Sequence, residues 1–310
     1  MDVAHKKPGA WVTMITNADY LAGCFVMAKS LRTVKTKYPL VVLVCDIPQN
    51  AKEILELTGV EIVDVGKLVS ADSEQVKDKR FLESWTKLRA FDMIDYEVGS
   101  QRIVLLDADM LVRQNMDELM ELPLEDGWIA CTHACACNPR KFAHYPADWI
   151  PENCAYTNKI HPPPIAEDSP RPYHQLNSGL VVLRPSREQF QELYTFLKES
   201  PLVATFMFTD QDLTTLVYKD RWKPLPYVYN ALKTLRVVHP NLWSDDNVKN
   251  VHYILSDKPW LSRPKSGTPY YVVDKWWWEA YEGYIRELSS GGTEAHKSAV
   301  KYLEALVAKD

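Results

Sequence analysis

The chain has 310 residues, of which 46% are hydrophobic and 25% are charged, and its formal net charge at pH 7 is -5. This length fits one large α/β domain or two small ones, and the composition is that of an ordinary globular protein. The mildly acidic balance, without a block of lysine and arginine, indicates that the chain does not bind nucleic acid.

The first part of the chain predicts strands that alternate with helices. Apolar runs predict strands, and helical spacing of apolar residues predicts the helices between them. The elements in order are a strand at 11–15, a helix at 17–32, a strand at 40–46, a helix at 51–57 and a strand at 60–65. This order is typical of a doubly wound α/β fold. No G-x-G-x-x-G follows the first strand, so a dinucleotide loop is not expected there.

The sequence then changes character. Repeated prolines make residues 133–175 an irregular loop of the kind that often binds a ligand. The elements predicted outside this loop are helices at 85–94, 189–198, 210–218, 275–288 and 293–307 and strands at 103–106, 180–186 and 248–255. We find no internal repeat and no linker, so we expect a single α/β domain over residues 1–310. Its C-terminal helices would span about 275–307, where Trp276 to Trp278 could pack on the domain or form a homodimer.

The first eleven residues lack the apolar segment of a signal peptide. No apolar run approaches the roughly 18 residues that a membrane span needs. We therefore expect a cytoplasmic protein without a membrane span. The six cysteines are too few for a disulfide scaffold, so we interpret them as reduced thiols.

Four of these cysteines, Cys131, Cys135, Cys137 and Cys154, lie close together along the chain with His133 between them. One interpretation is a zinc site. The other is a set of half-buried thiols packed in a loop. The irregular ligand spacing, which lacks paired Cys-x2-Cys units, favours the second interpretation.

Asp107 and Asp109 interrupt an apolar segment, because IVLL precedes them and MLV follows. Residues i and i+2 of a strand point to the same face, so both carboxylates could bind one cation at the end of a strand. Carboxylate oxygens suit Mg²⁺ or Mn²⁺, and an added imidazole favours Mn²⁺. The alternative is a solvated acid pair, or one that is neutralised by Arg113.

Three further residues are candidates for the same site. His252 could be a third metal ligand or a core histidine. Lys258, followed by Pro259 and Trp260, could bind a phosphate or lie on the surface, and Lys87 has the same two interpretations.

Together these segments resemble the family 8 glycosyltransferases, which are retaining enzymes of the GT-A fold that use UDP-sugars and Mn²⁺. The resemblance extends over about residues 10–285, and its motifs include SWTKLRAFD, VLLDADMLV, LNSGLVVLRPS, TDQDLTTLVY and VHYILSDKPW. Within the family the chain looks most similar to galactinol synthases, and next to glycogenins. The fold this implies is a single Rossmann-like GT-A domain with a mixed central sheet flanked by helices.

The resemblance also implies roles for individual residues. Asp107, Asp109 and His252 would bind Mn²⁺, and Tyr20 would stack on the uracil base. Catalytic roles would fall to Lys87, Asp210, Gln211 and Lys258. The donor site as a whole would comprise Met14, Thr16, Asn17, Tyr20, Arg80, Lys87, Asp107, Ala108, Asp109, Asn177, Ser178, Gly179, His252 and Lys258.

The activity so implied is transfer of galactose or glucose from a UDP-sugar to a small polyol or sugar, with myo-inositol as the best single acceptor. Residues 133–175 depart from the family pattern and would shape the acceptor site. A glycogenin-like protein that glucosylates its own tyrosine, Tyr227 or Tyr229, is a second hypothesis. A catalytically inactive UDP-sugar sensor is a third.

Overall fold

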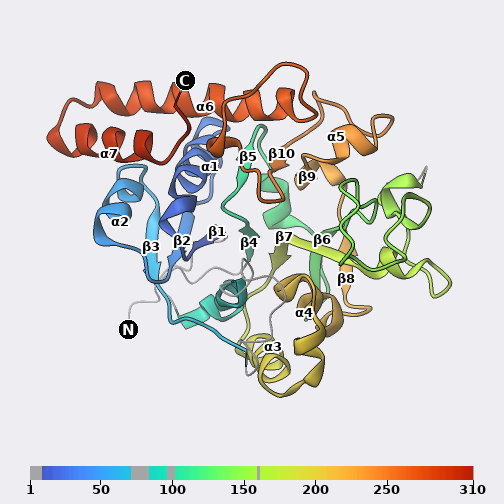
Figure 1. Cartoon of the computed structure of the whole chain (residues 1–310). Helices are drawn as coiled ribbons and strands as arrows, with labels where there is room; N and C mark the ends of the chain where they lie inside the picture. Colours follow the sequence, from blue (N-terminus) through green and yellow to red (C-terminus); the bar gives the residue numbers. More distant parts are fainter. Residues whose placement is uncertain (1–8, 71–83, 96–101, 159–160, 310) are drawn as a thin grey trace.

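The computed structural model describes residues 9–70, 84–95, 102–158 and 161–309, so the predicted donor residue Arg80 lies outside the described residues (Figure 1). Strands in the order β3-β2-β1-β4-β7-β6-β8 form a seven-stranded sheet. They are β1 (Ala10–Ile15), β2 (Leu40–Val44), β3 (Glu61–Asp64), β4 (Ile103–Leu106), β6 (Ile129–His133), β7 (Leu176–Leu183) and β8 (Trp222–Pro224). Strand β7 runs antiparallel to β4 and β6, whereas the other neighbours are parallel. The expected mixed α/β sheet is confirmed.

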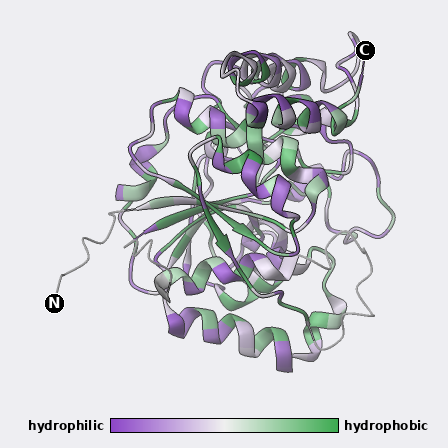
Figure 2. Ribbon diagram, turned by 90° about the vertical axis from the view of Figure 1, so that its left-hand side faces the viewer, coloured by the Kyte–Doolittle hydropathy of each residue, from purple (hydrophilic) through white to green (hydrophobic). Residues whose placement is uncertain are grey.

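Helices cover both faces of this sheet, which appears as a largely apolar layer between them (Figure 2). The helices are α1 (Leu21–Thr33), α2 (Gln49–Glu56), η4 (Ser84–Asp95), α3 (Arg187–Glu199), α4 (Thr209–Val217), α6 (Tyr271–Ser290) and α7 (Glu294–Ala305). Successive residues of a strand point to opposite faces. Trp11 accordingly belongs to the core on the side of α1, α2, α6 and α7, whereas Val12 belongs to the core on the side of η4, α3 and α4. Burial on both faces explains the continuous apolar runs in β1 and β2.

A second, three-stranded sheet has the order β5-β10-β9 and was not predicted. Its strands are β5 (Met110–Val112), β9 (Ala231–Leu232) and β10 (Asn250–His252). Residues 107–109 form a bend that carries the chain from β4 in the large sheet to β5 in the small one. The prediction that Asp107 and Asp109 share one strand is therefore wrong, and alternation along a strand does not bring their carboxylates together.

Two other predicted elements need comment. The helix predicted at 85–94 is present, and it is the 3₁₀ helix η4. Its buried residues Trp85, Leu88 and Phe91 recur every third position, a spacing that fits a 3₁₀ helix as well as an α-helix. The predicted strand at 248–255 is only β10, and the chain turns away after His252.

The loop between β6 and β7 contains only short 3₁₀ turns in its described part, as the prolines predict. The tryptophans of α6 pack within the chain: Trp277 and Trp278 are buried, and Trp276 lies under the guanidinium of Arg113 at 3.6 Å. They therefore give no support to a homodimer. No helix in the described ranges combines the length and apolar character needed to cross a membrane.

Candidate active site

The bend between the two sheets brings two carboxylates to the imidazole that ends β10. His252 Nε2 lies 3.5 Å from Asp107 Oδ2 and 3.3 Å from Asp109 Oδ1. Backbone hydrogen bonds hold the bend on both sides, because Asp107 N donates to Gly179 O over 2.9 Å and Tyr253 N donates to Asp109 O over 2.9 Å. The two acids and His252 form one of the two groups in the described part of the chain that could hold a metal ion.

Two glycines make room for this arrangement. A Cβ atom on Gly179 would lie 2.3 Å from His252 Cε1, so any side chain there would displace the imidazole. A Cβ atom on Gly23, in α1, would lie 2.7 Å from the carbonyl oxygen of Ala108 in the bend. Both positions require glycine because neighbouring atoms approach the backbone closely, and neither has a positive φ.

Asn230 fixes the His252 tautomer that a metal needs. His252 Nδ1 lies 2.8 Å from Asn230 Oδ1, and Asn230 Nδ2 donates to Asn177 Oδ1 at 2.7 Å and to Thr132 Oγ1 at 3.0 Å. An amide oxygen only accepts, so Nδ1 carries a hydrogen, and Nε2 is the ring nitrogen left to give its lone pair to a cation bound between the two carboxylates. Three electron-pair donors facing one another fit a divalent cation, with Asn230 supporting the ligand His252.

Two lysines neutralise the buried acids. Lys258 Nζ pairs with Asp109 and donates to Tyr253 O at 2.9 Å, while Lys87 Nζ lies 2.6 Å from Asp107 Oδ1 and 3.1 Å from Asp210 Oδ2. Both side chains are about nine-tenths buried, so neither is a surface lysine. The alternative pairing of the aspartates with Arg113 is wrong, because that guanidinium donates to the Asp245 carbonyl instead.

Burial and ion pairing shift the pKa values of these acids and lysines in opposite directions. Burial raises the pKa of Asp107 despite the opposing effect of Lys87. Burial alone would raise the pKa of Asp109 too, but Lys258 and His252 outweigh it and hold that pKa far below its usual range. Burial would likewise lower the pKa of Lys87 and of Lys258, yet their aspartate partners keep both above the ordinary lysine value. The site therefore holds two ammonium groups beside the acids.

The start of α4 adds Asp210 and Gln211. Asp210 Oδ2 accepts from Ser178 Oγ at 2.8 Å as well as from Lys87, and Gln211 Oε1 accepts from Asn177 Nδ2 at 3.1 Å. Thr209 precedes them with φ +32°, a strained value for a residue with a branched side chain. Strain of this kind is commonly found at functional sites, and here it accompanies the turn of Asp210 into the site.

These groups open into one cavity of about 710 Å³. Every predicted donor or catalytic residue within the described ranges lines it: Met14, Thr16, Asn17, Tyr20, Lys87, Asp107, Ala108, Asp109, Asn177, Ser178, Gly179, Asp210, Gln211, His252 and Lys258. The structure therefore places these fifteen residues together, although their individual roles stay predictions.

Another part of the cavity lining, the aromatic wall, comes from the irregular loop and was only partly predicted. Phe142, Tyr145 and Trp149 line it, and Phe208 completes it from the turn before α4. The Trp149 and Phe208 rings stack at 4.8 Å, and Tyr145 meets Phe208 edge to face at 4.9 Å. The sequence offered no pattern for this wall beyond the density of aromatic residues after 140.

The cysteine group differs from the one that the sequence indicated. Cys131 is buried in β6, and His133 Nδ1 bonds to the Tyr173 carbonyl at 2.9 Å, so neither joins the cluster. Cys135, Cys137 and Cys154 instead gather around His239, which sequence spacing did not suggest.

Comparison with known proteins identifies the family. The sequence profile of glycosyl transferase family 8 matches residues 11–263. The chain belongs to glycosyl transferase family 8. Galactinol synthase 1 of Solanum lycopersicum is 31% identical over 307 residues, which cover 96% of this chain and 89% of that protein. Galactinol synthase 1 of Arabidopsis thaliana is 29% identical, with 88% of this chain and 78% of that protein covered.

Solved structures agree on the fold. The galactosyltransferase LgtC, solved in complex with donor and acceptor sugar analogs, superposes with a TM-score of 0.59 at 16% identity, covering 88% of this chain and 95% of LgtC. The glycosyltransferase GlyE of Streptococcus pneumoniae TIGR4 gives 0.58 at 16% identity, covering 97% of this chain and 65% of GlyE. The protein is therefore a family 8 glycosyltransferase with a GT-A fold, and its similarity to galactinol synthases is confirmed.

Proposed function

We propose that this glycosyltransferase moves galactose or glucose from a UDP-sugar to a small polyol, with Mn²⁺ bound by Asp107, Asp109 and His252. The observation that carries the proposal is the convergence of this ligand set with Lys87, Lys258 and Asp210 in one cavity. Two carboxylates and one imidazole favour Mn²⁺ over the harder Mg²⁺. Bound there, the cation would hold the diphosphate of the donor and spread the charge left when the sugar departs.

Lys258 has the position of a group that stabilises this leaving diphosphate. Its ammonium is buried beside Asp109 and lies 5.7 Å from the centre of the Tyr20 ring. Phosphate oxygens entering the cavity would offer it a second anionic partner, and the charge on that partner grows as the glycosidic bond breaks. A cation placed there stabilises the transition state more than the bound substrate.

Asp210 holds Lys87 and is a poor nucleophile in this setting. One of its oxygens already accepts from Lys87 and from Ser178, which draws charge away from the carboxylate. Double displacement needs an available carboxylate beside the anomeric carbon. We therefore favour attack by the acceptor on the same face from which the diphosphate leaves, with the departing phosphate taking the acceptor proton. This route retains the anomeric configuration.

The aromatic wall provides the acceptor end of the cavity. Trp149, Tyr145 and Phe142 come from the loop that the sequence assigns to the acceptor. Aromatic faces pack against the C–H groups of sugars and cyclitols, whereas the hydroxyl groups need polar partners such as Arg140 and Asn138 in the same wall. This combination supports a small polyol, with myo-inositol as the first candidate because of the similarity to galactinol synthases.

Self-glucosylation is the weaker alternative. Tyr227 is buried and its hydroxyl accepts from Ser244 N at 2.9 Å, and the Tyr229 hydroxyl donates to Glu118 at 2.8 Å. Neither is among the described residues that line the cavity. An inactive sensor is also disfavoured, because the metal ligands and both lysines are present together. The single domain, the homodimer and the cytoplasmic location stay predictions.

The test is a product analysis with the purified protein, Mn²⁺ and either UDP-galactose or UDP-glucose, with and without myo-inositol. UDP release, intact protein mass and the anomeric configuration of the product are followed together. We expect inositol to stimulate UDP release with one donor, the protein mass to stay constant and the product to keep the α configuration. A mass increase in hexose steps without acceptor would replace this proposal with self-glucosylation. UDP binding without any turnover would indicate a sensor.

A further inference from the structure

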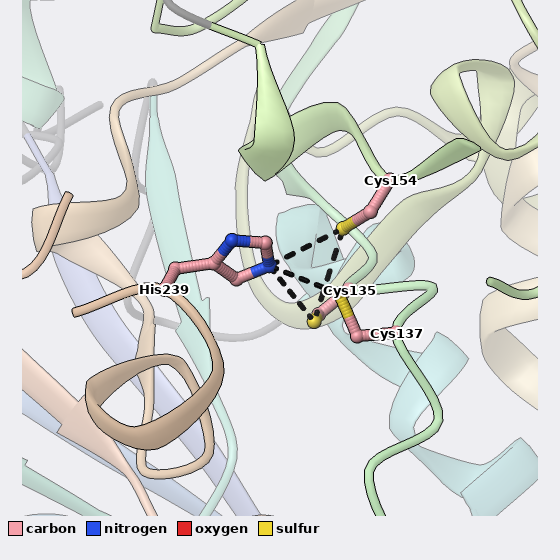
Figure 3. Close-up of side chains that lie close together, drawn as sticks. All are labelled: Cys135, Cys137, Cys154 and His239. Atoms are coloured by element: carbon pink, nitrogen blue, oxygen red, sulfur yellow. Dashed lines mark hydrogen bonds between the residues drawn. The ribbon is translucent and has the colours of Figure 1, made fainter. Parts of the chain in front are cut away.

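The second candidate metal site in the described residues lies beside the aromatic wall, because one of its members, Cys135, lines the same cavity as Phe142 and Tyr145. Cys135 and Cys137 follow β6, Cys154 begins the turn η7 (Ala155–Thr157), and His239 follows the short helix α5 (Leu235–Val238). Figure 3 shows His239 Nε2 directed at the sulfur atoms of the three cysteines. Segments up to 104 residues apart in the sequence thus meet at one point.

The distances match a tetrahedron of zinc ligands. Zinc binds sulfur at about 2.3 Å and imidazole nitrogen at about 2.0 Å, so tetrahedral ligands lie about 3.8 Å apart for two sulfurs and about 3.5 Å apart for sulfur and nitrogen. His239 Nε2 lies 3.1, 3.8 and 3.6 Å from the sulfurs of Cys137, Cys135 and Cys154. The Cys135 and Cys154 sulfurs are 3.9 Å apart, and all four ligand atoms lie within 4.8 Å of one another.

Ligand chemistry distinguishes this buried group from the acidic site. Cys154, Cys137 and His239 are at most 9% exposed, and no carboxylate belongs to the cluster. Thiolate sulfur selects zinc over Mg²⁺ or Mn²⁺, and four protein ligands without an open position are typical of a structural zinc site. A disulfide would need two sulfurs at about 2.05 Å, which is far from 3.9 Å.

We propose that Cys135, Cys137, Cys154 and His239 bind one structural zinc ion, which joins the irregular loop to the segment after α5. The loop lacks strands and α-helices in its described part and needs such a link to hold a defined shape. Cys135 itself lines the cavity, and Asn138 and Arg140 follow directly. The zinc ion would therefore fix the position of the aromatic wall that we assign to the acceptor. This consequence rests on the proposed function, whereas the zinc site itself does not.

The first experiment measures metal content in the full chain, expressed with zinc and dialysed against a mild chelator. We expect about one zinc per chain in the wild type and less than one-fifth of that in Cys137→Ser and in His239→Ala. Cys131→Ala, which removes a buried thiol outside the cluster, should keep its zinc. Asp109→Asn should also keep it, which separates this ion from any zinc bound at the acidic site. Absence of zinc from the wild type, or loss in Asp109→Asn alone, would overturn the proposal.

A second measurement avoids variants that fail to fold. The wild-type protein is loaded with Co²⁺ in place of zinc, and its absorption spectrum is recorded. A tetrahedral site with three thiolates gives sulfur-to-cobalt charge-transfer bands and intense visible bands, which six-coordinate cobalt at the carboxylate site does not give. Absence of these bands would contradict the zinc site. A thiol titration of the unfolded, metal-free chain that finds four free thiols instead of six would contradict it too, because it would indicate a disulfide.

In Cys137→Ser the KM for the acceptor should rise several-fold, while the affinity for UDP with Mn²⁺ should change less than two-fold.

Discussion

His252 Nδ1 lies 2.8 Å from Asn230 Oδ1, and this contact determines what the other ring nitrogen can do. Because Asn230 uses its amide hydrogens on Asn177 and Thr132, its oxygen is left to accept from the imidazole. Nε2, which lies 3.5 Å from Asp107 and 3.3 Å from Asp109, is then the nitrogen available to a metal ion. An uncharged asparagine, at least 22 residues from each of the three ligands in the sequence, thus orients the imidazole of the metal site.

Replacing this asparagine should weaken the metal site without removing a ligand. In Asn230→Ala the imidazole loses its fixed tautomer and orientation, so we expect Mn²⁺ affinity to fall about 10- to 100-fold. Electron paramagnetic resonance of free Mn²⁺ during a titration measures this directly. Asn247→Ala, at an exposed asparagine, is the control and should bind as the wild type does. Wild-type Mn²⁺ affinity in Asn230→Ala would show that the contact has no role in metal binding.

Gly179→Ala should inactivate the enzyme through one methyl group. That methyl would lie 2.3 Å from His252 Cε1, so the ring must move away from the two carboxylates. We expect loss of Mn²⁺-dependent UDP binding in a folded protein, checked by calorimetry and circular dichroism. Gly283→Ala is a matched control, since its new methyl meets nothing closer than 4.0 Å in the helix α6. Normal UDP binding in Gly179→Ala would mean that the imidazole need not stay where it is.

Lys258→Ala should reduce turnover more than donor binding. We expect kcat to fall about 100-fold, as when one charged group that stabilises a leaving oxyanion is removed, with a much smaller change in the donor KM. The metal-free variant should also be less stable than the wild type, because the buried Asp109 loses its ammonium partner and keeps His252 beside it, and Mn²⁺ should restore part of the loss. Lys265→Ala, on the exposed loop before α6, is the control. A rise in KM alone would place Lys258 in ground-state binding only.

Asp274 in α6 should make the protein less stable as the pH rises. Burial raises the pKa of this carboxyl to about 6, and Lys233 offsets only part of the effect. The folded state therefore binds more protons than the unfolded state between pH 4 and 6, so the free energy of unfolding falls over this range and stays lower above it. Asp274→Asn removes the penalty, and we expect it to gain about 1–2 kcal/mol at pH 7.5 and little at pH 4.5.

Urea denaturation of wild type and variant at the two pH values gives the comparison. Glu279→Gln, at an exposed acid of the same helix that pairs with Lys275 at the surface, is the control and should change the stability at either pH far less than Asp274→Asn. An Asp274→Asn variant that is less stable than the wild type at both pH values would mean that the charged carboxylate is favourable where it lies.

The parts of the fold that follow from local pattern were predictable. Strands β1 and β2 have six and five residues and are buried on both faces, so their apolar runs stand out in the sequence. The small sheet was not predictable, because β9 has two residues and β5 and β10 have three each. Such short strands have no period of their own, and they depend on pairing: β5 pairs with β10, which lies more than 100 residues further along the chain, and β10 pairs with β9.

The residues of the candidate site likewise include some that the sequence predicts and some that it does not. Residues inside compact motifs, such as Asp107, Asp109 and His252, could be proposed from the sequence. Asn230 and His239 could not, because an amide or an imidazole becomes significant only through what it faces. The strand argument for Asp107 and Asp109 predicted their convergence for the wrong reason, since the bend between the sheets, and not strand alternation, brings them together.

The most direct test is isothermal titration of UDP into wild type and Asp109→Asn, each with Mn²⁺ and with a chelator. Asp109 lies 3.3 Å from His252 Nε2 at the centre of the proposed metal site. We predict that the wild type binds UDP tightly only with Mn²⁺ and that the folded variant loses this dependence together with the affinity. Equal UDP affinity of both proteins in Mn²⁺ would contradict the assignment of the metal and donor site to this cavity.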